Sequence, residues 1–229
     1  MNLTTSVVIS TYNRPDGVLQ LLRSLAKQTV LPEVIIVVDQ SKKDEIKKAI
    51  EKAQSEAVNS GKPLPPIDHC AVTFQGLTPS RNYGLARVKT HYTTFLDDDV
   101  TVGPRYLEEA LAFFKTHETT VLGGIPQFPG IVDRKGPPIP SKKWQLYRKF
   151  FHLTRPSDSC KLLDNFEIEY CVDLKEPVQT DFISGSNFTV ITNLAKEVGF
   201  DEKLIWYSIG EDLDFPLRMR MLRPNSVWQ

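Results

Sequence analysis

The sequence contains few residues of the types that build disulfide frameworks or zinc sites. It has three cysteines among 229 residues, Cys70, Cys160 and Cys171, whose spacing matches neither a disulfide pattern nor a zinc motif. Reduced, structural thiols are therefore expected, which suits a cytoplasmic protein. The four histidines share no metal-binding spacing either, so we assign them to the surface or the core.

The chain also lacks an excess of charge and a long apolar run. Lys+Arg and Asp+Glu both number 28, so the net charge is zero and no general attraction to nucleic acid or to an anionic membrane is expected. No stretch approaches the roughly 18 apolar residues that a membrane-spanning helix needs. The first residues do not resemble a signal peptide. Any function that depends on charge must therefore be local.

One cluster of basic and aromatic residues interrupts this neutral background. It covers residues 142–152, KKWQLYRKFFH. Such a segment can touch a membrane surface peripherally, which would suit an acceptor linked to a lipid. A solvated helix that packs its aromatic side chains inward is the favoured interpretation, and nucleic-acid binding is the weakest of the three.

Apolar periodicity predicts the secondary structure of the first 125 residues. Short β-branched runs indicate buried strands, and apolar residues at spacings of three and four indicate helices. The predicted strands are 6–10, 34–38, 71–74, 92–96 and 121–125, and the predicted helices are 42–59 and 79–87 and those that start at 15 and 103. This alternation predicts an α/β fold with a mostly parallel sheet that is covered on both faces.

The second part of the chain is less regular. Residues 126–141 are rich in proline and glycine, which predicts a loop. Regularity returns with a strand at 182–191, a helix at about 193–198 and a last helix at about 211–222. We find no internal repeat, so one domain over residues 1–229 is expected.

Acidic residues at the ends of two predicted strands are the main candidates for a site. Asp39 ends the strand at 34–38, and Asp97, Asp98 and Asp99 follow the strand that ends at Leu96. Ligands of open α/β sheets bind at the carboxyl ends of the strands. Since side chains alternate along a strand, Asp97 and Asp99 should form a pair suited to Mn²⁺ or Mg²⁺, whose coordination substrate phosphates would complete. The alternative is a solvated acidic turn that caps the next helix.

Six segments follow one another along the chain in an informative order. They are VVISTYNRPDGVLQLLRSL, VIIVVDQS, LTPSRNYGLA, TTFLDDDVTV, GSNFTVIT and IGEDLDFPLRMR, and they extend from Val7 to about Arg220. Each alone is a weak signal, but together and in this order they resemble the family 2 glycosyltransferases, which have the GT-A fold. The resemblance implies a Rossmann-like, mostly parallel sheet flanked by helices. It also implies a nucleotide-binding half at 1–125 and a smaller acceptor-binding half at 126–229.

The resemblance implies roles for residues on the donor side. The residues expected to bind the nucleotide sugar are Thr11, Tyr12, Arg14, Asp39, Arg81, Asp97 and Asp98. Asp39 would recognise the base, because a carboxylate can accept a hydrogen bond from a base N–H. Asp97 and Asp99 would hold the ribose and the metal, with Asp99 preferred as the direct metal ligand. The arginines would neutralise phosphate oxygens.

Sugar transfer also needs a base that takes the proton of the acceptor hydroxyl. The resemblance assigns this role to the acids of Gly210-Glu211-Asp212, with Asp212 preferred over Glu211. It also implies a single displacement with inversion at the anomeric carbon. Capping of a helix by acids is the alternative explanation of this motif.

A loop near the donor sugar and the acceptor completes the expected site. It would comprise Gly185, Ser186 and Asn187, for which a turn at the entry of a strand is the alternative. Trp206 could supply an apolar platform for a sugar ring, although core packing explains it equally well.

The expected function is transfer of a sugar from a UDP-sugar, or secondly a dTDP-sugar, to a hydroxyl of a growing polysaccharide or a lipid-linked glycan. A nucleotidyltransferase is one alternative, but Thr11-Tyr12-Asn13-Arg14-Pro15-Asp16 is a poor match to the glycine-rich basic loop that it would need. A non-catalytic carbohydrate-assembly module is another. Gln40 departs from the family pattern, and an ending at Gln229 suggests a shortened C-terminal part.

Overall fold

The structure is a computed structural model of the chain. It describes residues 3–124, 155–157, 161–162, 169–171, 174, 176–204, 208 and 210–229. The predicted loop at 126–141, the basic and aromatic segment at 142–152 and Trp206 lie outside these residues.

Within the described part of the chain, a seven-stranded sheet has the order β3-β2-β1-β4-β8-β5-β9. Its strands are β1 (Thr5–Thr11), β2 (Ile35–Asp39), β3 (Ile67–Ala71), β4 (Tyr92–Asp97), β5 (Val121–Gly123), β8 (Asn187–Ile191) and β9 (Val227–Trp228). Strands β1 to β4 are parallel, whereas β8 runs antiparallel to both β4 and β5. A separate pair joins β6 (Arg155–Ser157) and β7 (Glu169–Cys171). The expected mostly parallel sheet is confirmed.

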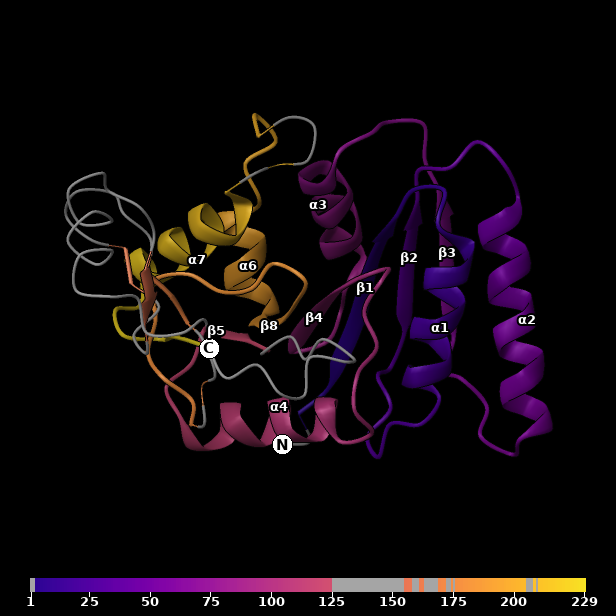
Figure 1. Cartoon of the computed structure of the whole chain (residues 1–229), viewed down its shortest axis with the longest axis horizontal. Coiled ribbons are helices and arrows are strands. Elements are labelled where there is room, and N and C mark those ends of the chain that lie inside the picture. Colours follow the sequence, from indigo (N-terminus) through magenta and orange to yellow (C-terminus); the bar gives the residue numbers. More distant parts are fainter. Residues whose placement is uncertain are drawn as a thin grey trace, which may run out of the picture.

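Helices cover both faces of this sheet. They are α1 (Pro15–Leu25), α2 (Glu45–Asn59), α3 (Leu77–Arg87), α4 (Tyr106–Thr116), α6 (Thr192–Val198) and α7 (Glu211–Leu222). Figure 1 shows α1 and α2 together beside β1 to β3, and α6 and α7 together above β8. Among the described residues, no helix is both long enough and apolar enough to cross a membrane.

Alternation along the strands divides the core into two clusters. In β1, Val7 and Ile9 pack toward α1 and α2, whereas Val8 belongs to the cluster on the opposite face, under α3 and α7. Both faces of β1 are therefore apolar, which explains why its sequence is continuously rather than alternately hydrophobic.

The third strand begins four residues earlier in the chain than we predicted. We expected it at 71–74, but β3 is Ile67–Ala71. It is an edge strand that pairs only with β2 among the described residues, and its residues are mostly half-buried. An edge strand can carry polar residues, so the more apolar segment that follows was mistaken for it. Phe74 instead packs outside the strand against Tyr83.

The C-terminal strands also differ from the prediction in length. The strand expected at 182–191 is confirmed only at 187–191, and the short strand β9 was not predicted. The preceding residues are held from outside the sheet, because Ser184 N–H donates to the Gln229 side chain and Ile183 N–H to the Asp212 carbonyl. The predicted last helix at 211–222 is confirmed as α7.

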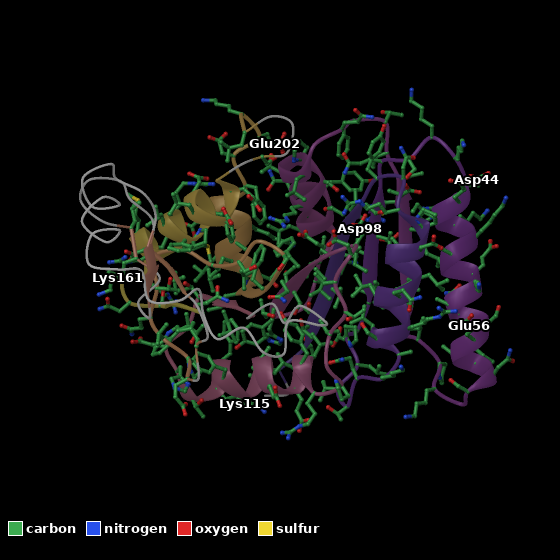
Figure 2. The ribbon with its side chains drawn as sticks, in the orientation of Figure 1. Asp44, Glu56, Asp98, Lys115, Lys161 and Glu202 are labelled. Carbon is green, nitrogen blue, oxygen red and sulfur yellow. The ribbon has the colours of Figure 1, made fainter. Side chains whose placement is uncertain are left out.

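Three parallel strands bring the candidate acids to one edge of the sheet. In the β1–β2 pair Thr11 lies opposite Asp39, and in the β1–β4 pair Ser10 lies opposite Asp97. The carboxyl ends of β2 and β4 therefore flank the end of β1, as the sequence predicted. Figure 2 shows Asp98 in the middle of the molecule, with Asp44 and Glu56 at its margin.

Phe95 of β4 offers a test of this packing. It is almost fully buried, and its ring stacks on Phe188 of β8 with centroids 4.9 Å apart. We expect Phe95→Ala to lower the free energy of unfolding by about 3–5 kcal/mol, because a large cavity would remain. Urea unfolding measures this value, with Met221→Ala as the control, since Met221 is 82% exposed. Equal effects of the two substitutions would contradict the assignment of Phe95 to the core.

Candidate active site

The acids at the end of β4 face opposite sides of the sheet. Asp97 contacts Arg81 of α3, and Asp98 accepts a hydrogen bond of 2.8 Å from the hydroxyl of Thr11 on the α1 side. Asp97 and Asp98 thus alternate as predicted, but the strand ends at Asp97, and Asp99 shares the Nη1 atom of Arg14 with Asp98. Burial raises the pKa of Asp98, while Thr11 and the charge of Arg14 lower it. Through Thr11 and Arg14, Asp98 thus holds the loop after β1 in place.

Arg14 links this loop to the acidic turn. It precedes α1, and its Nη1 donates to Asp98 Oδ1 at 3.1 Å and to Asp99 Oδ2 at 2.8 Å. Arg14 and Asp99 have side chains 56% and 60% exposed. An exposed ion pair contributes little stability, so it can open readily to other ligands. The side chains of Arg14 and Asp99 are therefore accessible to a ligand at the surface of the site.

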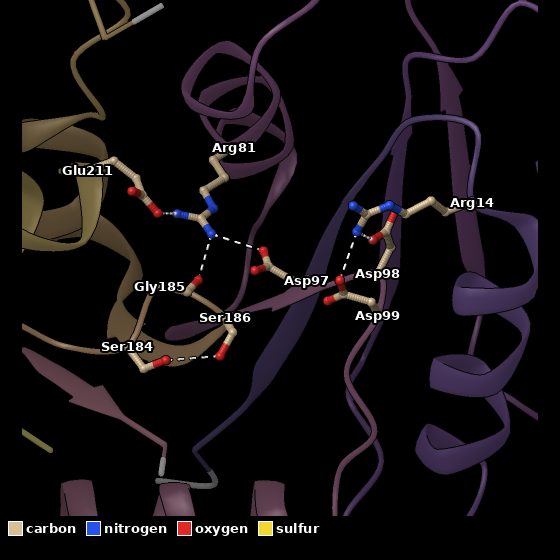
Figure 3. Close-up of polar contacts among 9 residues, drawn as sticks. All are labelled: Arg14, Arg81, Asp97, Asp98, Asp99, Ser184, Gly185, Ser186 and Glu211. Atoms are coloured by element: carbon tan, nitrogen blue, oxygen red, sulfur yellow. Dashed lines mark hydrogen bonds and ion pairs between the residues drawn. The ribbon is translucent and has the colours of Figure 1, made fainter. Parts of the chain in front are cut away.

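Arg81 is the opposite case, a cation that is almost completely buried. Its side chain is 3% exposed, and Figure 3 shows its guanidinium between three acceptors. Nη1 donates to Glu211 Oε1 at 2.8 Å, and Nη2 donates to Asp97 Oδ1 at 3.1 Å and to the Gly185 carbonyl at 2.6 Å. The carbon between these nitrogens lies 5.2 Å from the ring centre of Phe188. One side chain thus joins three segments that are far apart in sequence.

Two adjacent acids begin α7, and they differ in their surroundings. Burial raises the pKa of Glu211, although its contact with Arg81 lowers it. Burial also raises the pKa of Asp212, against the effect of the backbone N–H groups at the start of the helix. Among the described residues, no side chain donates a hydrogen bond to Asp212. Glu211 therefore shares the charge of Arg81 through a hydrogen bond, whereas backbone N–H groups are the partners of the Asp212 carboxylate within the described residues.

The loop before β8 lies directly against these acids. A Cβ atom on Gly185 would come within 2.6 Å of Glu211 Oε1 and 3.2 Å of Asp212 Cβ, so a larger residue there would displace the Glu211 carboxylate. The backbone carbonyl of Ser186 accepts the N–H of Asp97 at 2.9 Å. The structure thus brings the loop of residues 185–186, the end of β4 and the start of α7 together.

Asn187 and Tyr12 occupy different environments. Asn187 begins β8 and is buried, and its side-chain oxygen has no hydrogen-bond partner within the described part of the chain. Tyr12 follows β1 and is 48% exposed, so its ring is accessible from solvent. Trp206 is not among the described residues, and its expected role stays a prediction.

Asp39 lies on the far side of β1 from Arg81 and has its own partners. Its carboxylate accepts the N–H of Ser41 at 2.8 Å, and His69 Nε2 lies 3.0 Å from the other oxygen. Neither partner was singled out from the sequence. His69 was missed because the third strand was predicted four residues too late, which removed it from the strand beside Asp39.

The sequence of the chain is similar to that of known proteins. A sequence model described as Glycosyl transferase family 2 matches residues 6–167. The chain belongs to this family. As a member of family 2, it is 29% identical over 128 residues to the poly(ribitol-phosphate) β-N-acetylglucosaminyltransferase TarS of Staphylococcus aureus (strain Mu50). The match covers 51% of this chain and 20% of TarS, so the chain spans about a fifth of that relative.

Solved structures of glycosyltransferases share the fold of this family 2 chain. A structure of S. aureus TarS 1–349 with UDP-GlcNAc has a TM-score of 0.59 at 20% identity, covering 95% of this chain and 53% of that one. The mannosyltransferase PcManGT from Pyrobaculum calidifontis, in complex with GDP-Man and Mn²⁺, has a TM-score of 0.60 at 14% identity, covering 95% and 52%. At these identities the likeness establishes the fold, which is GT-A as expected.

The acids of this family 2 site can be compared with the needs of a divalent cation. Asp97 and Asp99 are close enough that the charge of Asp99 raises the pKa of Asp97, although burial is the larger cause. Among the described residues, no group of three or more histidine, cysteine, aspartate or glutamate side chains could hold a metal alone. Two carboxylates fit a hard cation that takes its other oxygen ligands from water and substrate phosphates.

The buried contacts of Arg81 predict a large loss of stability when its charge is removed. We expect Arg81→Met to lower the free energy of unfolding by about 3 kcal/mol at pH 7.5, because the buried Glu211 and the partly buried Asp97 would remain without a counter-charge. Since burial raises both pKa values in the folded protein, protonation favours the folded state. The deficit should therefore shrink as the pH falls from 7.5 toward about 5.

Urea unfolding at the two pH values measures this effect, and Arg23→Met is the matched control. Arg23 pairs with Glu56 through two hydrogen bonds of 2.7 Å, but on the surface. Its replacement should cause a small loss. A deficit for Arg81→Met that is equally small, or that grows at low pH, would contradict the role of Arg81 as the counter-charge.

Proposed function

We propose that this chain transfers a sugar from a UDP-sugar to a hydroxyl group of a glycan acceptor, with inversion, and that Asp212 is the general base. One observation carries the proposal: the guanidinium of Arg81 contacts both Asp97, at the end of β4, and Glu211, at the start of α7. The resemblance to family 2 assigns donor binding to the first segment and the base to the second. Their shared contact supports a single site that holds both substrates.

The donor would lie along the carboxyl edge of the sheet. Thr11 ends β1, Tyr12 and Arg14 follow it, and Asp39 ends β2, so a nucleotide at the edge would meet all four. The proposal of UDP is supported by TarS, which has been solved with UDP and with UDP-GlcNAc. A dTDP-sugar remains the second candidate, since thymine and uracil present the same N3–H. The GDP-Man complex of PcManGT makes guanine a necessary comparison.

Asp212 would accept the proton of the acceptor hydroxyl. As that oxygen attacks the anomeric carbon, the bond from this carbon to the diphosphate oxygen breaks and its electron pair leaves with the diphosphate. Attack from the opposite face inverts the configuration, with no sugar bound covalently to the enzyme. A raised pKa makes a carboxylate a better proton acceptor near neutral pH. Burial raises the pKa of Asp212 in this way, which supports its choice as base.

Glu211 and Arg81 would position this base. Glu211 is tied to Arg81 at 2.8 Å, and Gly185 leaves the loop close against both acids of α7. These contacts hold the first turn of α7 at the end of β4. A base that is already held in position loses less entropy when the reaction begins, which lowers the free-energy barrier to sugar transfer.

Asp97 and Asp99 would hold a divalent cation, Mn²⁺ or Mg²⁺. Such a cation, when bound, stabilises the charge of the leaving diphosphate as a Lewis acid. Arg14 would then exchange its exposed contact with Asp99 for a phosphate oxygen, because both are anionic acceptors for a guanidinium. Support for a cation comes from the donor chemistry of the two acids and from the Mn²⁺ complex of PcManGT.

The acceptor is proposed only as a class. TarS is named for its action on poly(ribitol-phosphate), and this chain spans a fifth of TarS. A growing polysaccharide or a lipid-linked glycan fits the chemistry of a hydroxyl nucleophile. The acceptor-binding half at 126–229, the peripheral membrane contact at 142–152 and Trp206 are parts of this proposal that await experiment.

Nucleotide binding gives the first test. With Mn²⁺ present, UDP at a hundred times its dissociation constant should stabilise the protein by about 2.7 kcal/mol, which raises the unfolding temperature by roughly 5–10 °C for a chain of this size. Thermal unfolding with UDP, dTDP, GDP and CDP, each with and without Mn²⁺, measures the effect. The shift with UDP should exceed that with GDP. If no nucleotide stabilises the protein in the presence of metal, the proposed donor site is wrong.

Asp212→Asn gives the second test. The amide cannot take up a proton, so we expect kcat to fall by about 10²–10⁴-fold while the stabilisation by UDP is retained. Transfer of radiolabelled sugar from the UDP-sugar that binds best measures the rate. This result would also separate an enzyme from a non-catalytic carbohydrate-assembly module, which would show no transfer to lose.

The matched control is Asp214→Asn, two residues along the same helix. Asp214 is paired with Arg218 on the surface of α7 at i,i+4 spacing. Its replacement should leave kcat within a few-fold of the parent. Parent-like activity of Asp212→Asn, or an equal loss in both variants, would remove Asp212 from the mechanism.

A further inference from the structure

Asp39 is more deeply buried than the acids that follow β4, and it is held by a continuous set of hydrogen bonds. Its side chain is 3% exposed. Ser41 N–H donates to one carboxylate oxygen at 2.8 Å, and His69 Nε2 lies 3.0 Å from the other. The hydroxyl of Ser41 in turn accepts the N–H of Asn13 at 2.8 Å. These bonds join β3, the end of β2 and the loop after β1.

The chemistry of the pair fixes which group donates. An ionised carboxylate only accepts hydrogen bonds, so the Nε2 atom of His69 carries the hydrogen. Each carboxylate oxygen can accept two bonds, and Ser41 and His69 use one on each oxygen. One acceptor position therefore remains on each oxygen for a ligand.

The strand register explains why a histidine at this position reaches Asp39. Residue 69 lies opposite Val37, and Ala71 lies opposite Asp39. Val37 and Asp39 share a face of the sheet because they are two residues apart in β2. The imidazole of His69 spans this distance along the neighbouring strand. Within the described residues, no lysine or arginine lies within ion-pair distance of Asp39, which makes His69 its side-chain donor.

We propose that His69 is a positioning residue that orients the carboxylate of Asp39 to recognise an N3–H group of the donor's base. The inference rests on the proposed function, because it needs a nucleotide at the carboxyl edge. It assigns a part in base selection to a residue of β3, which lies outside the six sequence segments quoted above. With His69 removed, the Asp39 carboxylate keeps one donor and can rotate about its side-chain bonds.

The selected chemical class is a pyrimidine with a hydrogen on N3. Uracil and thymine carry this hydrogen and can donate it to a carboxylate. Cytosine has a bare N3 acceptor, which would face the negative charge of Asp39 and repel it. A carboxylate held in one orientation therefore favours UDP over CDP, and two nucleotides with the same ribose and diphosphate isolate this effect.

Two substitutions at His69 separate the effect of its N–H donor from the effect of its side-chain volume. His69→Phe keeps a ring of similar size and removes the N–H, whereas His69→Gln places an amide N–H near the position of Nε2. The control is His91→Phe, because His91 is exposed at the other end of the sheet, beside the hydroxyl of Thr4. Isothermal titration calorimetry with Mn²⁺ gives the dissociation constants of UDP and CDP for each protein.

We expect the parent to bind UDP at least about tenfold more tightly than CDP, because a single hydrogen bond to a charged group accounts for a difference of this size in affinity. His69→Phe should weaken UDP about tenfold with CDP unchanged, so the ratio approaches one, and His69→Gln should restore the ratio. His91→Phe should match the parent. Unchanged CDP binding also shows that the variant is folded.

Each contrary result has a distinct meaning. If His69→Phe weakens UDP and CDP equally, or leaves the ratio at the parent value, the inference is overturned and the proposed function stands. Equal binding of UDP and CDP by the parent has the same consequence. If the parent binds neither nucleotide, the proposed function itself is overturned, and this inference falls with it.

Discussion

The site depends on the burial of a single positive charge. Arg81 is almost inaccessible to solvent, and its guanidinium holds Asp97, Glu211 and the Gly185 carbonyl at hydrogen-bond distance. A buried cation without acceptors would be very costly, and so would the buried Glu211 and the partly buried Asp97 without a cation. Each group therefore requires the others in place. This mutual requirement holds α3, the end of β4, the loop before β8 and the start of α7 in one arrangement, above the aromatic core of Phe95 and Phe188.

The same reasoning separates acids that look alike in the sequence. Asp98 is held by Thr11 and Arg14, Asp39 by Ser41 and His69, and Glu211 by Arg81. These contacts hold three carboxylates in fixed orientations. Asp212 also has a pKa raised by burial, but within the described residues no side chain donates a hydrogen bond to it. Neighbours, rather than residue type, thus distinguish a proposed base from the acids that position it.

Much of the fold could be predicted because local patterns agreed with the tertiary structure. Continuous β-branched runs marked β1 and β2, which are covered on both faces, and the predicted helix at 211–222 is α7. The position predicted for β3 was wrong. Its sequence, IDHCA, belongs to an edge strand and lacks the continuous run of apolar β-branched residues that marked β1 and β2. The short strand β9 carries too few residues to show a period at all. For the candidate site, the acids and Arg81 were singled out from the sequence, whereas His69 was not, because the third strand was predicted too late in the chain.

The sequence by itself determined the family, the mostly parallel α/β sheet and the gathering of Asp39 and Asp97 at one edge. These follow from motif order and from the rule that parallel strands end on the same side, which needs no knowledge of side-chain contacts. Only the tertiary structure decided which charge neutralises which. Arg81 reaches Glu211 across 130 positions and Asp39 meets His69 across 30, and neither pairing has a local pattern. Ion pairs of this kind depend on distance and burial in space, which the order of residues does not record.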